Sequence, residues 1–167
     1  MSFPLERPRR LRDNPTIRDL LRETRVTPED LIYPLFVVPG SSVKSPIKSL
    51  ARQFHLSPDK AAETAKSFRG NGGRAVILFG LPERKDEFGA SGSDPSGPVQ
   101  TAIKAIKDAA PDLLVATDVC LCEYTDHGHC GVLRGGKVLN DPTLALLAGQ
   151  ALSHAAAGAD LVAPSDM

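Results

Sequence analysis

The sequence has 167 residues, 41% of them apolar, and its 20 basic side chains balance 20 acidic ones. This length is typical of one domain, and the apolar share is enough to build a core. A formal net charge of zero carries no electrostatic footprint for nucleic acid or for an anionic membrane, so we expect neither as a partner.

The sequence also shows no sign of export or membrane insertion. No apolar run approaches the roughly 20 residues of a membrane span, and no signal-peptide core follows Met1. We therefore expect a cytoplasmic, reducing compartment, in which cysteines remain thiols. Four arginines near the start are flanked by acids, which indicates a solvated arm or a subunit contact.

Residues 1–30 predict an N-terminal arm with a short helix. Residues 1–13 are polar and contain two prolines, so they offer little core of their own. Asn14 followed by Pro15 is a helix start, because Asn caps the first turn and Pro lacks only an N–H that would be unpaired there. Thr27 and Pro28 repeat this signal for a single turn.

Residues 31–167 alternate between strand and helix patterns. Apolar runs predict strands at 31–38, 75–79, 113–119 and 159–163. Helical periodicity and capping residues predict helices that start at Ser57-Pro58, Val99 and Asp141-Pro142, the last with a face of Leu144, Leu147, Ala148, Ala151 and Leu152. Residues 39–56 and 81–98 are predicted loops, and Pro34 counts against a central position for the first strand.

This order of strands and helices predicts an α/β fold with parallel strands joined by helical crossovers. A doubly wound sheet and a (β/α)8 barrel share the pattern. No G-x-G-x-x-G follows the first strand, which weakens the dinucleotide-binding version. A complete barrel needs about 250 residues, and only four strands can be counted here.

All three cysteines lie in one loop after the third predicted strand, at spacing C-x-C-x7-C (Cys120, Cys122, Cys130). Three interpretations are open. A disulfide would leave one thiol over, and a closed structural zinc would need His127 or His129 as a fourth ligand. An open zinc site would have three thiolates and a free fourth position, and it suits a loop at the end of a strand in an α/β fold.

The segment from Asp118 to Gly131 resembles the zinc-binding signature of the δ-aminolevulinic acid dehydratases, also called porphobilinogen synthases. Further matching segments run along nearly the whole chain: Leu31-Ile32-Tyr33-Pro34-Leu35-Phe36-Val37, Leu78-Phe79-Gly80-Leu81-Pro82, Asn140-Asp141-Pro142-Thr143-Leu144 and Ala159-Asp160-Leu161-Val162-Ala163-Pro164-Ser165-Asp166-Met167. One segment departs from the family pattern: Ser49-Leu50-Ala51-Arg52 stands where the family reads close to Ser-Met-Pro-Gly.

The resemblance implies a TIM-barrel fold with an N-terminal arm that embraces a neighbouring subunit, usually in a homo-octamer. Residues 31–167 would be the first half of that barrel. The implied reaction is a hydro-lyase condensation of two δ-aminolevulinate molecules to porphobilinogen with loss of water, in tetrapyrrole (haem) biosynthesis. The two Schiff-base lysines of the family lie in the second half of the barrel, so residues 1–167 alone are expected to be inactive.

The resemblance also implies roles for five residues. Cys120, Cys122 and Cys130 match the three zinc ligands. Asp118 matches an aspartate that contacts the substrate amine, although an ordinary loop-capping carboxylate is the alternative. Ser165 matches a serine near the catalytic lysines, and its alternative is a helix N-cap.

Other roles are left open by the sequence. His129 is either an auxiliary group beside a ligand or a loop hydrogen bonder, His127 has no assigned role, and His55 and His154 are expected on the surface or on a helix face. Two further functions also stay open for the chain: a non-catalytic half-barrel interaction module or subunit, and a zinc-storage or redox site.

Overall fold

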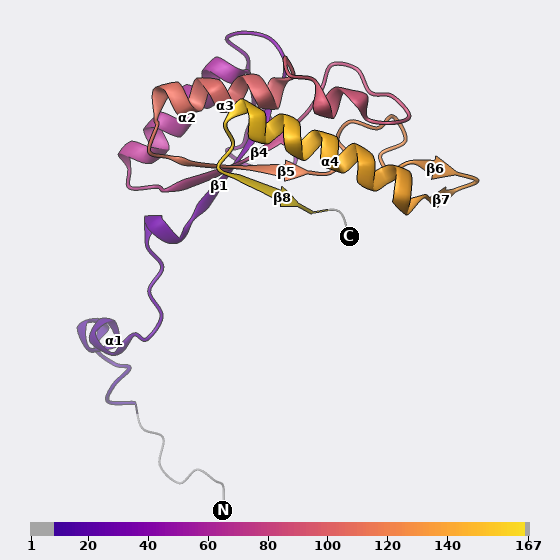
Figure 1. Cartoon of the computed structure of the whole chain (residues 1–167). Coiled ribbons are helices and arrows are strands. Elements are labelled where there is room, and N and C mark those ends of the chain that lie inside the picture. Colours follow the sequence, from indigo (N-terminus) through magenta and orange to yellow (C-terminus); the bar gives the residue numbers. More distant parts are fainter. Residues whose placement is uncertain (1–8, 166–167) are drawn as a thin grey trace, which may run out of the picture.

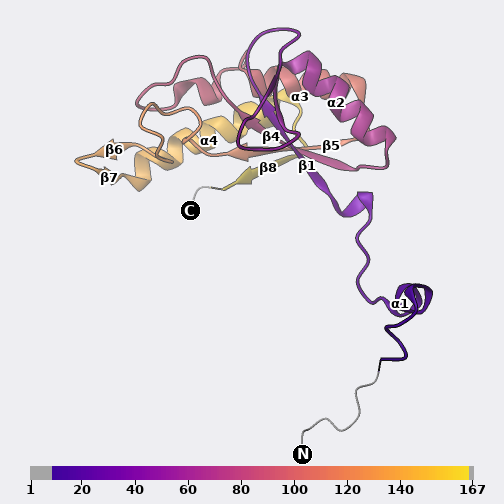
Figure 2. The same cartoon turned by 180° about the vertical axis from the view of Figure 1, so that it is seen from behind.

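The structure of the chain is a computed structural model that describes residues 9–165. An extended arm leads into a single layered body, and the arm stands away from that body in both views (Figures 1 and 2). The predicted arginine cluster begins at Arg7, which lies outside the described residues.

The arm contains the two predicted helix starts. Helix α1 covers Pro15–Leu21, and the Asn14 side chain accepts a hydrogen bond of 2.8 Å from the Thr16 N–H. The single turn η1 covers Pro28–Asp30, where the Asp30 carboxylate accepts from the Thr27 N–H at 2.8 Å. Neither element buries a residue, so local capping rather than core packing defines them.

The body is built on a sheet of six strands in the order β2-β3-β1-β4-β5-β8. Four of these strands are parallel and correspond to the predicted ones: β1 (Ile32–Val37), β4 (Ala75–Gly80), β5 (Leu114–Val119) and β8 (Leu161–Pro164). The predicted α/β fold with parallel strands is therefore confirmed. A separate hairpin joins β6 (Leu133–Arg134) to β7 (Lys137–Val138).

Helices cover one face of the sheet. Both views place α2 (Pro58–Gly70), α3 (Pro98–Ala109) and α4 (Asn140–Ala157) on the same side (Figures 1 and 2). Strand β4 alternates accordingly, with Val76 and Leu78 fully buried beneath the helices and Ile77 and Phe79 only half-buried on the other face. The main core thus lies between the sheet and its helical layer, and within residues 9–165 no helix covers the opposite face.

The prediction of an unstructured loop over residues 39–56 is wrong. This segment forms an antiparallel pair, β2 (Lys44–Pro46) with β3 (Phe54–Leu56), and β3 adds in parallel to the end of β1. Each strand has only three residues, too few for periodicity to register among the surrounding Pro, Gly and Ser. The pairing also depends on the edge of β1, which is a tertiary contact. The second predicted loop likewise contains one short turn, η2 (Ala90–Ser93).

Pro34 lies within β1, which has neighbours on both sides, contrary to the sequence expectation for proline. Its position resolves the conflict. Strand β3 pairs only with Phe36 and Val37, whereas Pro34 is in register with Ile77 of β4 alone. At Pro34, therefore, no described strand pairs with β1 on the side opposite β4. The missing N–H of proline is tolerated on that side, because no hydrogen bond to a described strand is lost.

Helix α4 differs most from its prediction. It begins at Asn140 after Leu139, so Asp141 is not its cap, and Gly158 ends it in the left-handed conformation as expected. Leu147 is buried, but Leu144 and Leu152 are 49% and 71% exposed. The buried face consists instead of Thr143, Leu147, Gln150 and His154.

His154 lies on a helix face, one of its two expected positions, but it is fully buried there because β5 offers it a partner. Its Nδ1 lies 3.0 Å from the Thr117 hydroxyl, on the side of β5 that faces the helix.

No helix among residues 9–165 is long and apolar enough to cross a membrane.

The burial of His154 predicts a pH dependence of stability. Burial lowers the pKa of folded His154 to about 4, whereas an unfolded histidine titrates near 6.5. Between these values the unfolded chain takes up a proton that the folded chain refuses. The free energy of unfolding should therefore fall as the pH drops from 6.5 to 4, by at most about 1.4 kcal/mol per pH unit from this residue.

This contribution can be measured by urea unfolding across the same pH window. His154→Gln keeps a polar group for Thr117 but cannot titrate, so its pH profile should be shallower than that of the unmodified chain. Parallel profiles for the two proteins would show that His154 is not the source.

Candidate metal centre

The cysteine loop begins where β5 ends, between two parallel neighbours. Asp118 and Val119 are in register with Ala163 and Pro164 of β8, and β4 pairs with the preceding part of β5. Cys120 follows the strand directly. The carboxyl ends of parallel strands share one edge of a sheet, so this edge holds the start of the loop.

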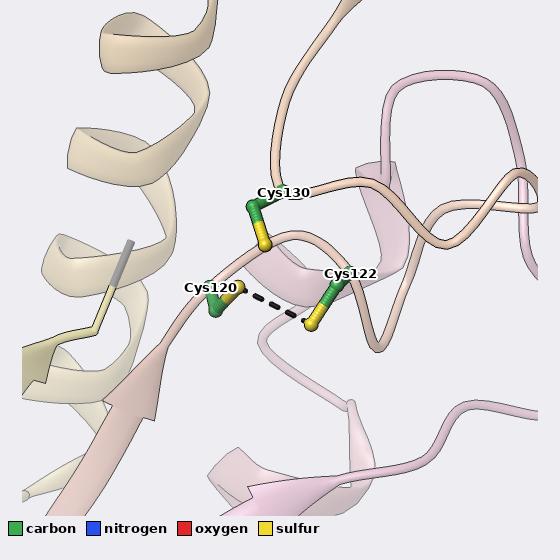
Figure 3. A group of neighbouring side chains, drawn as sticks. All are labelled: Cys120, Cys122 and Cys130. Carbon is green, nitrogen blue, oxygen red and sulfur yellow. Dashed lines mark hydrogen bonds between the residues drawn. The ribbon is translucent and has the colours of Figure 1, made fainter. Parts of the chain in front are cut away.

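The three cysteine side chains converge, as Figure 3 shows. Their sulfur atoms all lie within 4.8 Å of one another, and Cys120 Sγ is 3.3 Å from Cys122 Sγ. Cys120 is buried and the other two are half-buried; none forms a disulfide. Sulfurs bound tetrahedrally at 2.3 Å from zinc stand about 3.8 Å apart, so small shifts would bring this set onto an ion.

The thiols are held close enough to influence one another. Burial, the contact with Cys120 and the neighbouring thiols and Glu123 together raise the pKa of Cys122 well above its ordinary value. The ligand form of cysteine is the thiolate, so a metal ion must displace this proton on binding. A site made of three thiols can hold a metal ion, and the arrangement is that of a ligand cluster rather than a structural disulfide.

Tyr124 anchors the loop from behind. It is 1% exposed, and a Cβ built on Gly80 would lie only 2.1 Å from its hydroxyl. Gly80 is the last residue of β4 and is paired there opposite Val37. A glycine is needed at this position because Tyr124 and Val99 occupy the space of a side chain.

The loop after β4 packs against the cysteine loop. The Asp86 N–H donates to the Tyr124 carbonyl at 3.3 Å, and the Asp126 N–H donates to the Asp86 carbonyl at 3.1 Å. The Asp86 carboxylate in turn accepts from the Phe88 N–H at 2.8 Å. The long loop 81–98 therefore has a structural task, which is to brace the segment that carries the cysteines.

The two histidines of the motif take part in this bracing. The His129 N–H donates to His127 Nδ1 at 3.1 Å, which makes that nitrogen the acceptor of the ring. The other nitrogen, Nε2, is then the N–H that faces the Glu87 carbonyl at 3.3 Å. His127 is thus a loop hydrogen bonder, and neither histidine belongs to the cluster of sulfurs.

Asp118 and Ser165, the two residues predicted to be catalytic, lie at the ends of adjacent strands. Asp118 is 7% exposed and stands two residues before Cys120. The Ser165 N–H donates to the Val119 carbonyl at 3.4 Å, and its side chain is exposed. The fold places both residues at the edge that carries the thiols; their roles stay predictions.

Glu123 is a half-buried residue that sequence reasoning gave no reason to select. Burial first, and then the charge of Asp118, raise the pKa of Glu123 to about 8, although the Gly80 N–H and Lys85 oppose the shift. Its Oε2 atom is buried without a hydrogen-bond partner in the part of the chain that the structure describes. A single glutamate between a cysteine and a tyrosine carries no pattern from which a raised pKa could be predicted.

Comparison with known proteins agrees with this picture. The sequence model of the family Delta-aminolevulinic acid dehydratase matches residues 5–167. The chain is 49% identical over 167 residues to the Methanothermus sociabilis enzyme of that name, covering all of this chain and 52% of the relative. It is 48% identical over 163 residues to the Ruminiclostridium josui enzyme of the same name, covering 98% of this chain and 80% of that one.

A solved structure shares the fold. The delta-aminolevulinic acid dehydratase (porphobilinogen synthase) of Toxoplasma gondii ME49, in complex with the reaction product porphobilinogen, superposes with a TM-score of 0.89 at 40% identity. The match covers 99% of this chain and 48% of that one. The chain spans about half the length of most of the relatives named here.

Fold and site together define a TIM-barrel-family protein whose strand edge carries a cluster of three thiols. The four parallel strands with their helices correspond to part of such a barrel, as predicted. With the family match over residues 5–167, the assignment is specific. The chain belongs to the Delta-aminolevulinic acid dehydratase family.

The exit of the loop gives a test of how tightly the centre is packed. A Cβ on Gly131 would lie 2.6 Å from the Thr143 hydroxyl and 2.7 Å from Val138 Cγ1. Gly131→Ala should therefore lower the free energy of unfolding by about 1–3 kcal/mol. Gly70→Ala is the matched control, because nothing lies within 4 Å of its Cβ and it sits in a helix.

Urea unfolding of both variants measures the difference. Gly70→Ala should be neutral or stabilising by up to about 1 kcal/mol, since alanine favours a helix. Equal stability of the two variants would mean that the exit of the loop is loose enough to absorb a methyl group.

Proposed function

We propose that this chain carries the zinc-binding part of a porphobilinogen synthase active site. The convergence of Cys120, Cys122 and Cys130 at the carboxyl edge of the sheet is the observation that carries this proposal. Family membership supports it, as does the product bound to the Toxoplasma gondii relative. The reaction would be the condensation of two δ-aminolevulinate molecules to porphobilinogen with release of water.

The chemistry of the donor set favours zinc as the metal. Thiolates are soft ligands that select zinc over the hard ions magnesium and calcium, which prefer oxygen. Three protein ligands leave the fourth tetrahedral position for substrate or water, as in catalytic zinc sites. A zinc ion held there would polarise the oxygen or nitrogen atom that takes this position.

Asp118 is the residue proposed to bind the amine of that substrate. It stands on β5 at the same edge as the sulfurs and is nearly buried, so its attraction for an ammonium group is weakly screened. We propose a substrate contact for Ser165, whose side chain is exposed at the end of the neighbouring strand.

We also propose that the protein works as a homo-oligomer through its arm. Apolar side chains of the arm find no cover within the described chain: Leu20 is 76% exposed, Leu21 52% and Val26 74%. Residues 1–30 would then serve as the arm and residues 31–167 as the first half of the barrel. The alternative is that the chain acts as a non-catalytic half-barrel module, favoured by the exposed Leu144, Leu152 and Leu161.

Zinc binding is the first prediction of this proposal. The purified chain should bind one zinc ion, and cobalt in its place should show intense thiolate-to-cobalt absorption. Each of the variants Cys120→Ser, Cys122→Ser and Cys130→Ser should bind zinc more than about 100-fold more weakly. Mutation of residues that merely orient ligands already lowers metal affinity by about 10- to 100-fold, and loss of a ligand should lower it further. Ser165→Ala should leave the affinity unchanged, since that residue is assigned to substrate.

Competition with a chromophoric chelator gives these affinities. Wild-type affinity in any one of the three serine variants would remove that cysteine from the ligand set. Binding of zinc at several sites with equal affinity would argue against a defined centre.

Catalysis is tested best in a chimera, because the resemblance places the Schiff-base lysines in the second half of the barrel. This chain would replace the matching half of the Methanothermus sociabilis enzyme, and porphobilinogen formation from δ-aminolevulinate would be followed. We expect turnover that a zinc chelator abolishes, a loss of at least about 100-fold with Asp118→Asn, and no turnover by residues 1–167 alone. A folded, zinc-loaded chimera without activity would favour the non-catalytic module.

A further inference from the structure

The third proposed ligand is separated from the first two by a tight turn. Seven residues lie between Cys122 and Cys130, and the chain must reverse within them for the sulfurs to meet. Gly128 provides the reversal with a φ of +71°, and its N–H donates to the Thr125 carbonyl at 3.4 Å. The placement of Cys130 therefore depends on how this turn is closed.

Thr125 closes the turn from the inside. Its side chain is 1% exposed, and its hydroxyl donates a hydrogen bond of 2.8 Å to the carbonyl of His129, the residue directly before Cys130. Its backbone N–H donates at 2.9 Å to the carbonyl of Leu121, the residue between Cys120 and Cys122. One buried residue is thus bonded to both sides of the cysteine set.

We propose that Thr125 is a positioning residue for the metal centre: its hydroxyl bond to His129 sets the direction from which the Cys130 sulfur reaches the ion. The inference rests on the zinc site proposed above and concerns a residue that is not itself a ligand. Residues that orient ligands typically affect metal affinity by 10- to 100-fold. The hydrogen bond also restrains the backbone before Cys130 in the absence of the ion, so less conformational entropy is lost when the ion binds.

The Thr125 hydroxyl can be tested on its own, because other contacts hold the rest of the loop. The His129 side chain is exposed, and so is the hydrogen bond from the His129 backbone N–H to His127 Nδ1. The backbone around Thr125 is held separately, because Asp86 bonds to the residues on either side of it, Tyr124 and Asp126. Replacing the hydroxyl by a methyl group should therefore release the turn without releasing the whole loop.

Thr125→Val makes this change with the same side-chain shape. We expect zinc affinity, measured by chelator competition on the full chain, to fall about tenfold. The thiolate-to-cobalt absorption should also weaken or shift, because Cys130 would approach the ion differently. Thr125→Ser keeps the hydroxyl and should restore both affinity and spectrum to within about threefold of the unmodified chain.

Thr64→Val is the matched control for a general loss of stability. Thr64 is half-buried in α2, away from the centre, and its hydroxyl also donates to a backbone carbonyl, that of Lys60, at 2.8 Å. Its valine variant should bind zinc like the unmodified chain. Thermal unfolding of each variant confirms that the affinities refer to folded protein.

A second pair of variants tests the turn from the solvent side, which keeps the proposal testable if Thr125→Val fails to fold. Gly128→Ala strains the same turn, with no atom within 4 Å of the added methyl group. Gly135→Ala, at φ +58° in the β6–β7 turn, is equally open and equally strained. We expect zinc affinity to fall about fivefold in the first variant and to stay unchanged in the second.

The outcomes separate this inference from the proposed function. No zinc binding by the unmodified chain would overturn both. Wild-type affinity and cobalt spectrum in folded Thr125→Val, or in Gly128→Ala where the valine variant does not fold, would overturn the role of Thr125 alone. Equal losses in Thr125→Ser, which keeps the hydroxyl, and in Thr125→Val, which lacks it, would show that the hydroxyl does not determine zinc affinity and would also overturn its proposed role.

Discussion

Parallel pairing of β5 between β4 and β8 is the constraint on which the rest of this structure depends. It brings Asp118, Cys120 and Ser165 to one edge of the sheet, although they come from two strands more than 40 residues apart in the chain. Burial favours this register, since Val115, Thr117 and Val119 are buried on the side of the helices and a shift by one residue would turn them to the other face of the sheet. The register that protects the core therefore also sets the place of the proposed chemistry.

The strands and the cysteine cluster could be predicted because their signals are local. Continuous apolar runs mark β1, β4 and β5, and three cysteines within eleven residues leave few alternatives to a metal or thiol site. The roles of Asp118 and Ser165 came only from family resemblance. The structure adds their common position at one edge, which is a consequence of topology rather than of composition.

The features that the sequence did not predict share a different cause, since each of these features depends on a partner distant in the chain. His154 is buried because Thr117 of β5 faces it, and β3 exists because the end of β1 offers an edge. Periodicity assigned Leu144 and Leu152 to the buried face of α4, but the side of the helix that meets β5 carries polar residues. A pattern of apolar residues cannot anticipate a polar contact that tertiary packing completes.

The cysteine loop divides its tasks between two kinds of residue. Tyr124 and Thr125 are both buried. Tyr124 fills the space left by Gly80, and Thr125 is hydrogen-bonded to the carbonyls of Leu121 and His129. The cysteines beside them need only present sulfur atoms, because other side chains hold the backbone. Preorganisation of this kind lowers the entropy lost when a ligand set closes on an ion. In the metal centre proposed here, the buried Tyr124 and Thr125 hold the loop that presents the three cysteines, so the packing of the motif matters as well as its sulfur atoms.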